Sequence, residues 1–242
     1  SAKLPDKLVE KTVCIKPKEF SMMVLEGKGQ PYRRKMHGGK AMRIQMNGEN
    51  SIAVHTAVQY FPDATVRVHK IDKVHPDENT YLKLKDVDFH NGVIEADVCG
   101  GLLPDAPDYA RGFIGIVFRA SEGDDRFESF YVRPRNGRSC TDPRRRIHTM
   151  QYFSYPGYTF AYFRERGIAD FEAQADIDLD EWVHVKAEVA GAQARFFVDD
   201  MQTPALVVDE MFGGAERRGG VGLYVDNGTE GSFKNLQVTY AD

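Results

Sequence analysis

Hydrophobic and polar residues alternate through the middle of the chain. The runs at 92–98, 112–119 and 127–134 each place apolar side chains at alternate positions. Because successive side chains of a β-strand point to opposite faces of a sheet, this pattern predicts strands with one buried face. We expect residues 91–151 to form three or four consecutive antiparallel strands, with a polar hairpin turn at the sequence SEGDD.

Shorter runs of the same kind occur on both sides of this block. They lie at residues 12–15, 20–25, 41–46, 64–71, 81–84, 181–189, 194–198, 205–208, 221–225 and 233–240. Almost no segment has the spacing of an amphipathic helix. Short strands at intervals of roughly 8–12 residues are typical of all-β folds, so the sequence predicts a sandwich or a barrel.

The length and the composition favour one globular domain. The chain has 242 residues, of which 42% are hydrophobic and 28% charged, and it is long enough to bury a large core. The sequence shows no internal repeat and no interdomain linker. We therefore predict a single domain over residues 1–242, with residues 1–38 as an N-terminal arm or edge segment.

Charge and hydropathy argue against two classes of partner. A net charge of −4 argues against a general nucleic-acid binder. No run of about 18 apolar residues occurs, so we expect no membrane span. The N-terminus is polar and unlike a signal peptide, although Ser1 without a preceding Met leaves a removed signal open. We expect a periplasmic or extracellular protein if a signal was removed, and a cytoplasmic one otherwise.

The cysteines and histidines predict neither a disulfide framework nor a metal site. Cys14, Cys99 and Cys140 form an odd and sparse set, in which a single bridge between Cys99 and Cys140 stays open. No spacing of histidines or cysteines matches a zinc motif, which needs three or four convergent ligands. We expect no cofactor.

The polar face of the predicted central sheet carries an unusual set of side chains. The set consists of Glu95, Asp97, Arg119, Tyr131 and Arg133, which converge if neighbouring strands pair in order. Arginine suits the bidentate recognition of carboxylates or vicinal hydroxyls, and tyrosine offers a ring and a hydroxyl. We interpret this face as a ligand-binding face. The alternative is an exposed face with many salt bridges.

Two neighbouring segments carry further candidate ligand groups. Residues 140–148 read CTDPRRRIH and, together with Arg133, Arg135 and Arg138, form the densest positive charge of the chain. The choice of arginine indicates an anionic or planar ligand, and the alternative is a solvated loop. Residues 151–163 contain four tyrosines and three phenylalanines. Such aromatic stretches often line carbohydrate sites, because the C–H face of a sugar packs on a ring, but they also occur as simple core.

Several segments resemble one known superfamily. They read FHNGVIEADV, GFIGIVFR, FESFYVRP, DEWVHVKAEVAGAQARFFVDD, PALVV and GGVGLYVDNGTEGSFKNLQV. In this order they resemble the concanavalin A-like lectin/glucanase superfamily, and within it laminin-G-like domains and domains of the 3-keto-disaccharide-hydrolase type. The resemblance implies an all-β fold, a two-sheet antiparallel β-sandwich of the jelly-roll type, with a concave sheet face that holds carbohydrate. It also leaves a structural calcium open at the turns 199–200 and 226–227.

The resemblance does not settle an activity. The retaining glucanases of this superfamily carry a Glu-x-Asp-x-x-Glu or a Glu-x-Asp-x-Glu strand, and Glu95 and Asp97 match the first two acids. Cys99 stands where the second Glu would be, so this strand lacks the carboxyl pair, about 5–5.5 Å apart, that retaining hydrolysis needs. Glu128 is another partner for Glu95, but strict alternation places it on the apolar side unless a bulge intervenes.

A polysaccharide lyase is a second enzymatic route. It needs a base and cationic groups that stabilise a uronate carboxylate, and the tyrosines, the histidine and the arginines of these segments are groups of that kind.

The catalytic candidates over both routes are Glu95, Asp97, Tyr131 and His148. The substrate-binding candidates are Arg119, Arg133, Arg135, Gln151 and Tyr152. We expect a carbohydrate-binding or carbohydrate-active protein with an oligosaccharide or polysaccharide as partner. The alternative is a protein-interaction β-sandwich without catalytic activity.

Overall fold

The computed structural model describes residues 39, 41–72 and 74–241. The N-terminal arm predicted at 1–38, the two strands expected within it and Cys14 lie outside the described residues. The prediction of one domain over the whole chain therefore stays a prediction.

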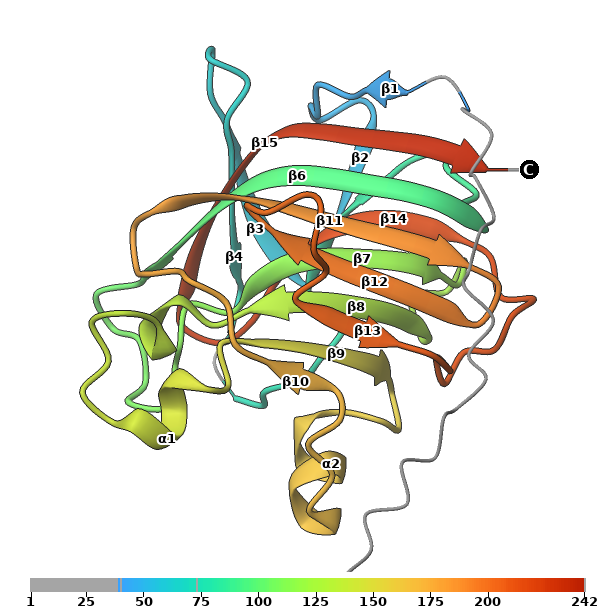
Figure 1. Ribbon diagram of the computed structural model, residues 1–242. Helices are drawn as coiled ribbons and strands as arrows, with labels where there is room; N and C mark the ends of the chain where they lie inside the picture. Colours follow the sequence, from blue (N-terminus) through green and yellow to red (C-terminus); the bar gives the residue numbers. More distant parts are fainter. Residues whose placement is uncertain (1–38, 40, 73, 242) are drawn as a thin grey trace, which may run out of the picture. The chain divides into compact units, whose positions relative to one another are not determined.

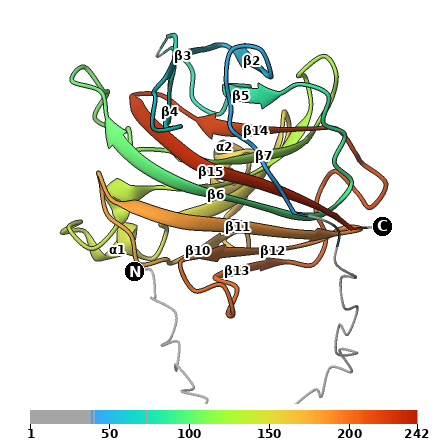
Figure 2. The same ribbon diagram turned by 90° about the horizontal axis from the view of Figure 1, so that it is seen from above.

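Two antiparallel sheets make up most of the described residues (Figures 1 and 2). The eight-stranded sheet contains β1 (Met42–Arg43), β3 (Thr56–Tyr60), β4 (Val66–Lys70), β6 (Asn91–Leu102), β11 (Trp182–Ala190), β12 (Gln193–Val198), β13 (Leu206–Val208) and β15 (Thr229–Ala241). Its strand order is β13-β12-β11-β6-β15-β4-β3, and β1 pairs with β15. The seven-stranded sheet contains β2 (Ser51–Val54), β5 (Tyr81–Leu84), β7 (Ile114–Ala120), β8 (Phe127–Val132), β9 (Met150–Tyr155), β10 (Glu172–Ala173) and β14 (Gly220–Val225). Its order is β10-β9-β8-β7-β14-β5-β2. The predicted two-sheet sandwich is confirmed.

The described residues also contain short helices, which the sequence did not predict. They are the 3-10 helix η1 (Pro134–Asn136), α1 (Pro143–Arg146) and α2 (Phe160–Arg166). Helix α2 lies below β9 and β10 in the view of Figure 1. It ends at Gly167, whose φ of 65° is the left-handed conformation that terminates many helices. With only two turns it is too short to produce a recognisable helical periodicity.

The hydrophobic core fills the space between the two sheets. Ile94, Ala96 and Val98 of β6 are fully buried in one cluster with Ile116 of β7 and Phe130 of β8. The alternating pattern of β6 is therefore confirmed, because its apolar residues point inward and the residues between them are half-buried. The burial of such side chains stabilises the fold by about 25 cal/mol for each Å² of apolar surface that leaves water.

The seven-stranded sheet is covered on its outer face as well. Tyr81, Phe127, Phe153 and Tyr224 form a second cluster there, against which Phe163 of α2 packs. Strands β7, β8 and β14 are consequently buried at every position. The polar outer face expected for β7 and β8 is wrong over most of its area, because aromatic rings from other segments cover it.

The expected order of strand pairing is correct for three of the four central strands. β7, β8 and β9 pair in sequence as antiparallel neighbours. β6 instead pairs with β11 and β15 in the other sheet. Alternation identifies a strand but not its partner, so the assignment of β6 to the same sheet as β7 was wrong.

The remaining sequence-based expectations concern membranes, cysteines and metals. Among the residues that the structure describes, no helix is long and apolar enough to cross a membrane. Cys99 and Cys140 are both free thiols, so the bridge that the sequence left open does not form. Within the described ranges, no group of three His, Cys, Asp or Glu side chains is arranged to hold a metal ion.

Candidate functional site

Glu95 and Asp97 lie on the outer face of the eight-stranded sheet. The Glu95 carboxylate accepts a hydrogen bond of 2.9 Å from Gln237 Nε2. Asp97 contacts His184 Nδ1 at 2.6 Å and accepts a bond of 2.6 Å from Asn235 Nδ2. Burial alone raises the pKa of Asp97, but the bonds from His184 and Asn235 outweigh this effect and hold it below its usual value.

Tyr131 and Arg133 lie on the opposite side of the molecule, on the outer face of the seven-stranded sheet. Their neighbours Phe130 and Val132 point into the core, so alternation turns Tyr131 and Arg133 outward from β8 and its end. The core separates them from Glu95. The expected convergence of these carboxylates with Tyr131 and Arg133 is therefore wrong, because their strands belong to different sheets.

Arg119 is not part of this group either. Its φ of 54° is left-handed, and the pairing of β7 with β14 shifts register at this point. The bulge turns the guanidinium toward the backbone oxygens of His90, Gly191 and Gly214, to which it donates at 2.8–3.2 Å. The side chain is 1% exposed, and it ties loops at the end of the sandwich together.

Tyr152 and Gln151 point to opposite faces of β9. Tyr152 lies in the core, where its hydroxyl donates to the carboxylate of Glu128. Burial raises the pKa of Glu128, and Arg217 Nη1 lies 3.2 Å from its Oε1. The sequence placed Glu128 on the apolar side, and this is confirmed. Glu95 and Glu128 do not form a carboxyl pair, since Glu95 lies on the outer face of the other sheet.

Gln151, by contrast, joins Tyr131 and Arg133. The Tyr131 hydroxyl donates to Gln151 Oε1 at 2.7 Å, and Arg133 Nη2 donates to the Tyr131 hydroxyl at 2.8 Å. Arg133 Nη1 pairs with Glu172 Oε1, and His148 Nδ1 lies 3.0 Å from Glu172 Oε2. Burial raises the pKa of Tyr131, which opposes a role as the base of a lyase.

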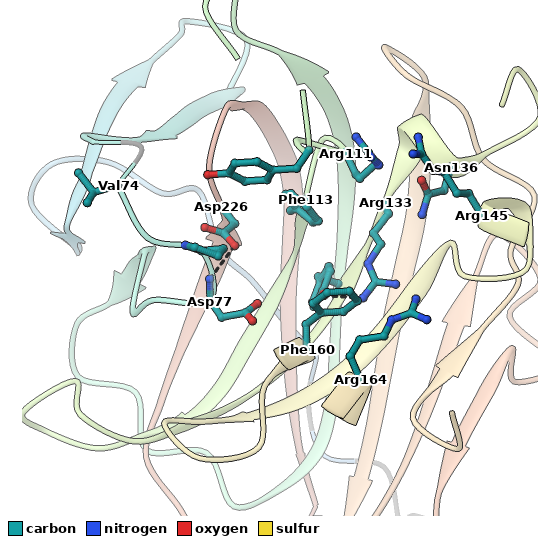
Figure 3. A pocket seen from close by; sticks show the side chains of 13 residues that line it. Val74, Asp77, Arg111, Phe113, Arg133, Asn136, Arg145, Phe160, Arg164 and Asp226 are labelled. Atoms are coloured by element: carbon teal, nitrogen blue, oxygen red, sulfur yellow. Dashed lines mark hydrogen bonds between the residues drawn. The ribbon is translucent and has the colours of Figure 1, made fainter. Parts of the chain in front are cut away.

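A cavity of about 490 Å³ opens beside this network (Figure 3). It lies at the end of the seven-stranded sheet where β7 begins and β8 and β14 finish, as the pairings Ile114–Val132 and Ile114–Val225 show. Its volume falls in the range of sites for small ligands. Its lining consists of Val74, Pro76, Asp77, Tyr109, Arg111, Phe113, Tyr131, Arg133, Asn136, Arg145, Phe160, Arg164 and Asp226.

The charged side chains are segregated across the cavity. Figure 3 shows Asp77 and Asp226 on one side, and Arg111, Arg145 and Arg164 on the other. Phe113 and Phe160 lie between the two groups in that view. A ligand in the cavity therefore meets carboxyl groups at one end and guanidinium groups at the other.

Asp226 is almost fully enclosed, with 2% of its surface exposed. Its Oδ2 accepts a bond of 2.9 Å from the backbone N–H of Asp77, and its Oδ1 one of 2.7 Å from that of Asn227. Burial raises the pKa of Asp226 to about 7, and the negative charge of Asp77 acts in the same direction. Burial also raises the pKa of Asp77. Both carboxyl groups are therefore easier to protonate than ordinary aspartates.

Aromatic rings form the walls between these charges. Phe160 is 38% exposed, and the guanidinium carbons of Arg133 and Arg164 lie 5.3 and 5.0 Å from its ring centroid. Tyr109 is 44% exposed, and its hydroxyl accepts a bond of 2.8 Å from Asn227 Nδ2. Both rings offer exposed apolar surface next to polar groups, which suits a ligand with alternating C–H and hydroxyl surface.

The structure thus brings some predicted residues together and separates others. Tyr131 and Arg133 line the cavity, and Gln151 and His148 support them. Arg135 lies close by, with its guanidinium donating to the backbone oxygens of Asp108 and Ala110 at 3.3 and 3.2 Å. The remaining candidates do not reach the cavity; they are Glu95, Asp97, Arg119 and Tyr152.

Sequence reasoning missed most of the other lining residues. Asp77 and Tyr109 stand in loops without a distinctive pattern, and only long-range contacts place them here. Arg145 belongs to the arginine-rich loop and Phe160 to the aromatic stretch, both of which the sequence had singled out. Asp226 had been considered only as a turn residue that could hold calcium.

Solved structures show what the fold resembles, while the sequence matches no family model and no curated protein. The carbohydrate-binding module CBM66 from Bacillus subtilis is 14% identical, with a TM-score of 0.53 over 78% of this chain and 96% of that chain. A protein of unknown function with a galectin-like fold from Bacillus subtilis is 12% identical, with a TM-score of 0.51 over 84% and 95%. A candidate glycosyl hydrolase from Parabacteroides distasonis is 11% identical, with a TM-score of 0.51 over 82% and 91%.

These similarities define the class of fold. The chain has the fold of these proteins, a two-sheet antiparallel jelly roll, as the resemblance of its sequence had implied. The finer resemblance to laminin-G-like domains and to 3-keto-disaccharide hydrolases stays a prediction.

Proposed function

We propose that this protein binds a saccharide in the cavity beside Tyr131 and Arg133. The observation that carries the proposal is the composition of the cavity wall. Exposed faces of Tyr109 and Phe160 stand next to hydrogen-bonding groups of both charge signs. Sugars present apolar C–H faces and polar hydroxyls side by side, and this wall complements both.

Two further observations support saccharide binding. The fold is similar to that of a protein named as a carbohydrate-binding module, so this jelly roll is compatible with such a function. The outer face of the eight-stranded sheet carries paired polar side chains such as Asp97, His184 and Lys186. Such paired polar side chains count against an interaction surface built on an apolar patch.

The test is a calorimetric titration of the protein with a panel of neutral and acidic oligosaccharides. Tyr109→Ala and Phe160→Ala should each weaken the binding of any ligand found by about tenfold, because each removes one stacking surface. Trp182→Ala is the matched control, since Trp182 is an aromatic residue of similar exposure (40%) on the other sheet. It should leave affinity unchanged.

Two results would contradict the proposal. One is the absence of binding heat with every member of a broad panel. The other is a ligand whose affinity depends on Trp182 and is indifferent to both Tyr109 and Phe160. The melting temperature of each variant shows whether it is folded.

A further inference from the structure

We propose that the saccharide carries a carboxylate, as a hexuronate unit does, and that Arg111, Arg145 and Arg164 bind that carboxylate. This inference rests on the proposed function and adds the chemical class of the ligand. A guanidinium group binds a carboxylate through two parallel N–H···O bonds, which a neutral hydroxyl cannot match in strength.

The first argument concerns carboxylate partners. Arg133 already pairs closely with a carboxylate, whereas no carboxylate in the described part of the chain lies at hydrogen-bond distance from the other three arginines. Arg133 pairs with Glu172, whose side chain is 6% exposed. Arg164 Nη2 lies 3.9 Å from the same carboxylate, at the limit of an ion pair, and the Arg164 side chain is 52% exposed. The close pair with Arg133 therefore compensates most of the charge of Glu172 before Arg164 is considered.

The charges of Arg145 and Arg111 are also poorly compensated by carboxylates. Arg145 Nε lies 3.7 Å from Asp142, whose carboxylate also pairs with Arg144 at 3.1 Å. Arg111 Nη1 donates to the backbone oxygens of Asp108 and Ala110, which carry no net charge. Among the described residues no ion pair joins Arg111 to a carboxylate, so its charge is the least compensated of the group.

The second argument is that these positive charges lie close enough to disfavour one another. Burial lowers the pKa of Arg111, and the charges of Arg145, Arg135 and Arg133 lower it further. An arrangement of like charges costs stability, and a bound anion relieves that cost. A negatively charged group is therefore stabilised on the arginine side of the cavity.

The third argument comes from the opposite wall. Asp77 and Asp226 face the arginines across the cavity in Figure 3, and no arginine stands on their side of it in that view. Carboxyl groups exchange hydrogen bonds with hydroxyls in either protonation state and offer no positive charge to an anion. The two walls therefore select a ligand with hydroxyls at one end and a negative charge at the other, which is the layout of a uronic acid.

The experiment measures binding to short oligomers of galacturonate and of mannuronate by calorimetry. The matched ligands are the neutral carboxyl-reduced oligomers of the same length and linkage, together with a sulfated galactose oligomer. The protein variants are Arg164→Gln and Arg145→Gln. Arg166→Gln is the control, because Arg166 lies on the same helix, pairs with Glu165 and does not line the cavity.

We expect one of the uronates to bind at least tenfold more tightly than its neutral counterpart. Arg164→Gln and Arg145→Gln should each weaken the uronate about tenfold, as the loss of one charge-assisted contact implies, and should weaken any binding of the neutral oligomer by a smaller factor. Both side chains are half exposed, so neither substitution should unfold the protein.

Three outcomes would overturn the inference. They are equal affinity for the neutral and acidic oligomers, tighter binding of the sulfated oligomer than of either uronate, and an Arg164→Gln variant that behaves like Arg166→Gln. In the first case a dependence on Tyr109 keeps the proposed saccharide site and removes only its acidic specificity. If no oligomer of any class binds, the proposed function fails together with this inference.

Discussion

Asp226 shows how its surroundings change the chemistry of a single residue. In solution an aspartate is ionised at neutral pH, but here burial raises its pKa to about 7. Lys70 from β4 opposes this shift, while Asp77 reinforces it. The hydrogen bond between Asp226 and the Asp77 backbone joins two segments that are 149 residues apart. No local feature of the sequence predicts such a pair.

The first prediction at this scale concerns stability and pH. Because the folded protein holds a proton on Asp226 up to about pH 7 and the unfolded chain releases it near pH 4, this residue contributes stability at low pH that is lost as the pH rises through this window. The loss is at most about 1.4 kcal/mol for each pH unit. Asp226→Asn removes the titration.

Urea unfolding of both proteins between pH 4 and pH 8 provides the measurement. The stability of the wild type relative to Asp226→Asn should fall as the pH rises from 4 to about 7 and should level off by about pH 8. A difference between the two proteins that stays constant over this range would show that Asp226 does not titrate as described.

At the scale of elements, the close packing of β7 against β8 positions Tyr131, which lines the cavity. Gly115 of β7 lies opposite Tyr131 of β8. A Cβ atom at Gly115 would lie 2.0 Å from the Phe130 oxygen and 2.5 Å from the Tyr131 Cα, both of which are backbone atoms. Only glycine allows the two strands and the aromatic cluster to pack at this distance.

The second prediction follows from this contact. Gly115→Ala should lower the free energy of unfolding by about 1–3 kcal/mol, because the backbone of β8 has to move. Gly157→Ala is the control, since nothing lies within 4 Å of a Cβ atom at that position. It should change stability by less than about 0.5 kcal/mol. Equal midpoints of chemical unfolding for the two variants would contradict the prediction.

At the scale of the whole molecule, the two sheets have outer faces of different character. The outer face of the eight-stranded sheet carries hydrogen-bonded polar pairs such as Glu95 with Gln237. The outer face of the seven-stranded sheet is covered by aromatic rings and by α2, and the cavity lies at one end of this sheet. The core lies between these faces, so a change on one face should not reach the other.

The third prediction tests this separation. The double substitution Glu95→Gln and Asp97→Asn should leave saccharide affinity within about twofold of the wild type, because both residues lie on the face opposite the cavity. The measurement is the calorimetric titration used for the cavity variants. A loss of affinity comparable to that of Tyr109→Ala would move the site to the eight-stranded sheet.

The strands were predictable from the sequence, and so was part of the site. Alternation is a local property, because each residue's direction follows from its neighbours, and it identified β6, β7, β8 and β11 correctly. Tyr131 and Arg133 were found for the same reason, and the arginine-rich and aromatic segments supplied Arg145 and Phe160. Helix α2 was missed because two turns in an aromatic segment leave no periodic signal.

The tertiary structure decided which strands share a sheet and which loops meet. The pairing of β6 with β11 and β15 depends on contacts between residues far apart in the chain, and alternation contains no information about them. That pairing moved Glu95 and Asp97 away from Tyr131. The pairing of β14 with β7 placed Asp226 at the cavity, and a hydrogen bond to Asp226 holds Asp77 there. The sequence by itself determined the strands and their buried faces, whereas folding alone determined the composition of the cavity.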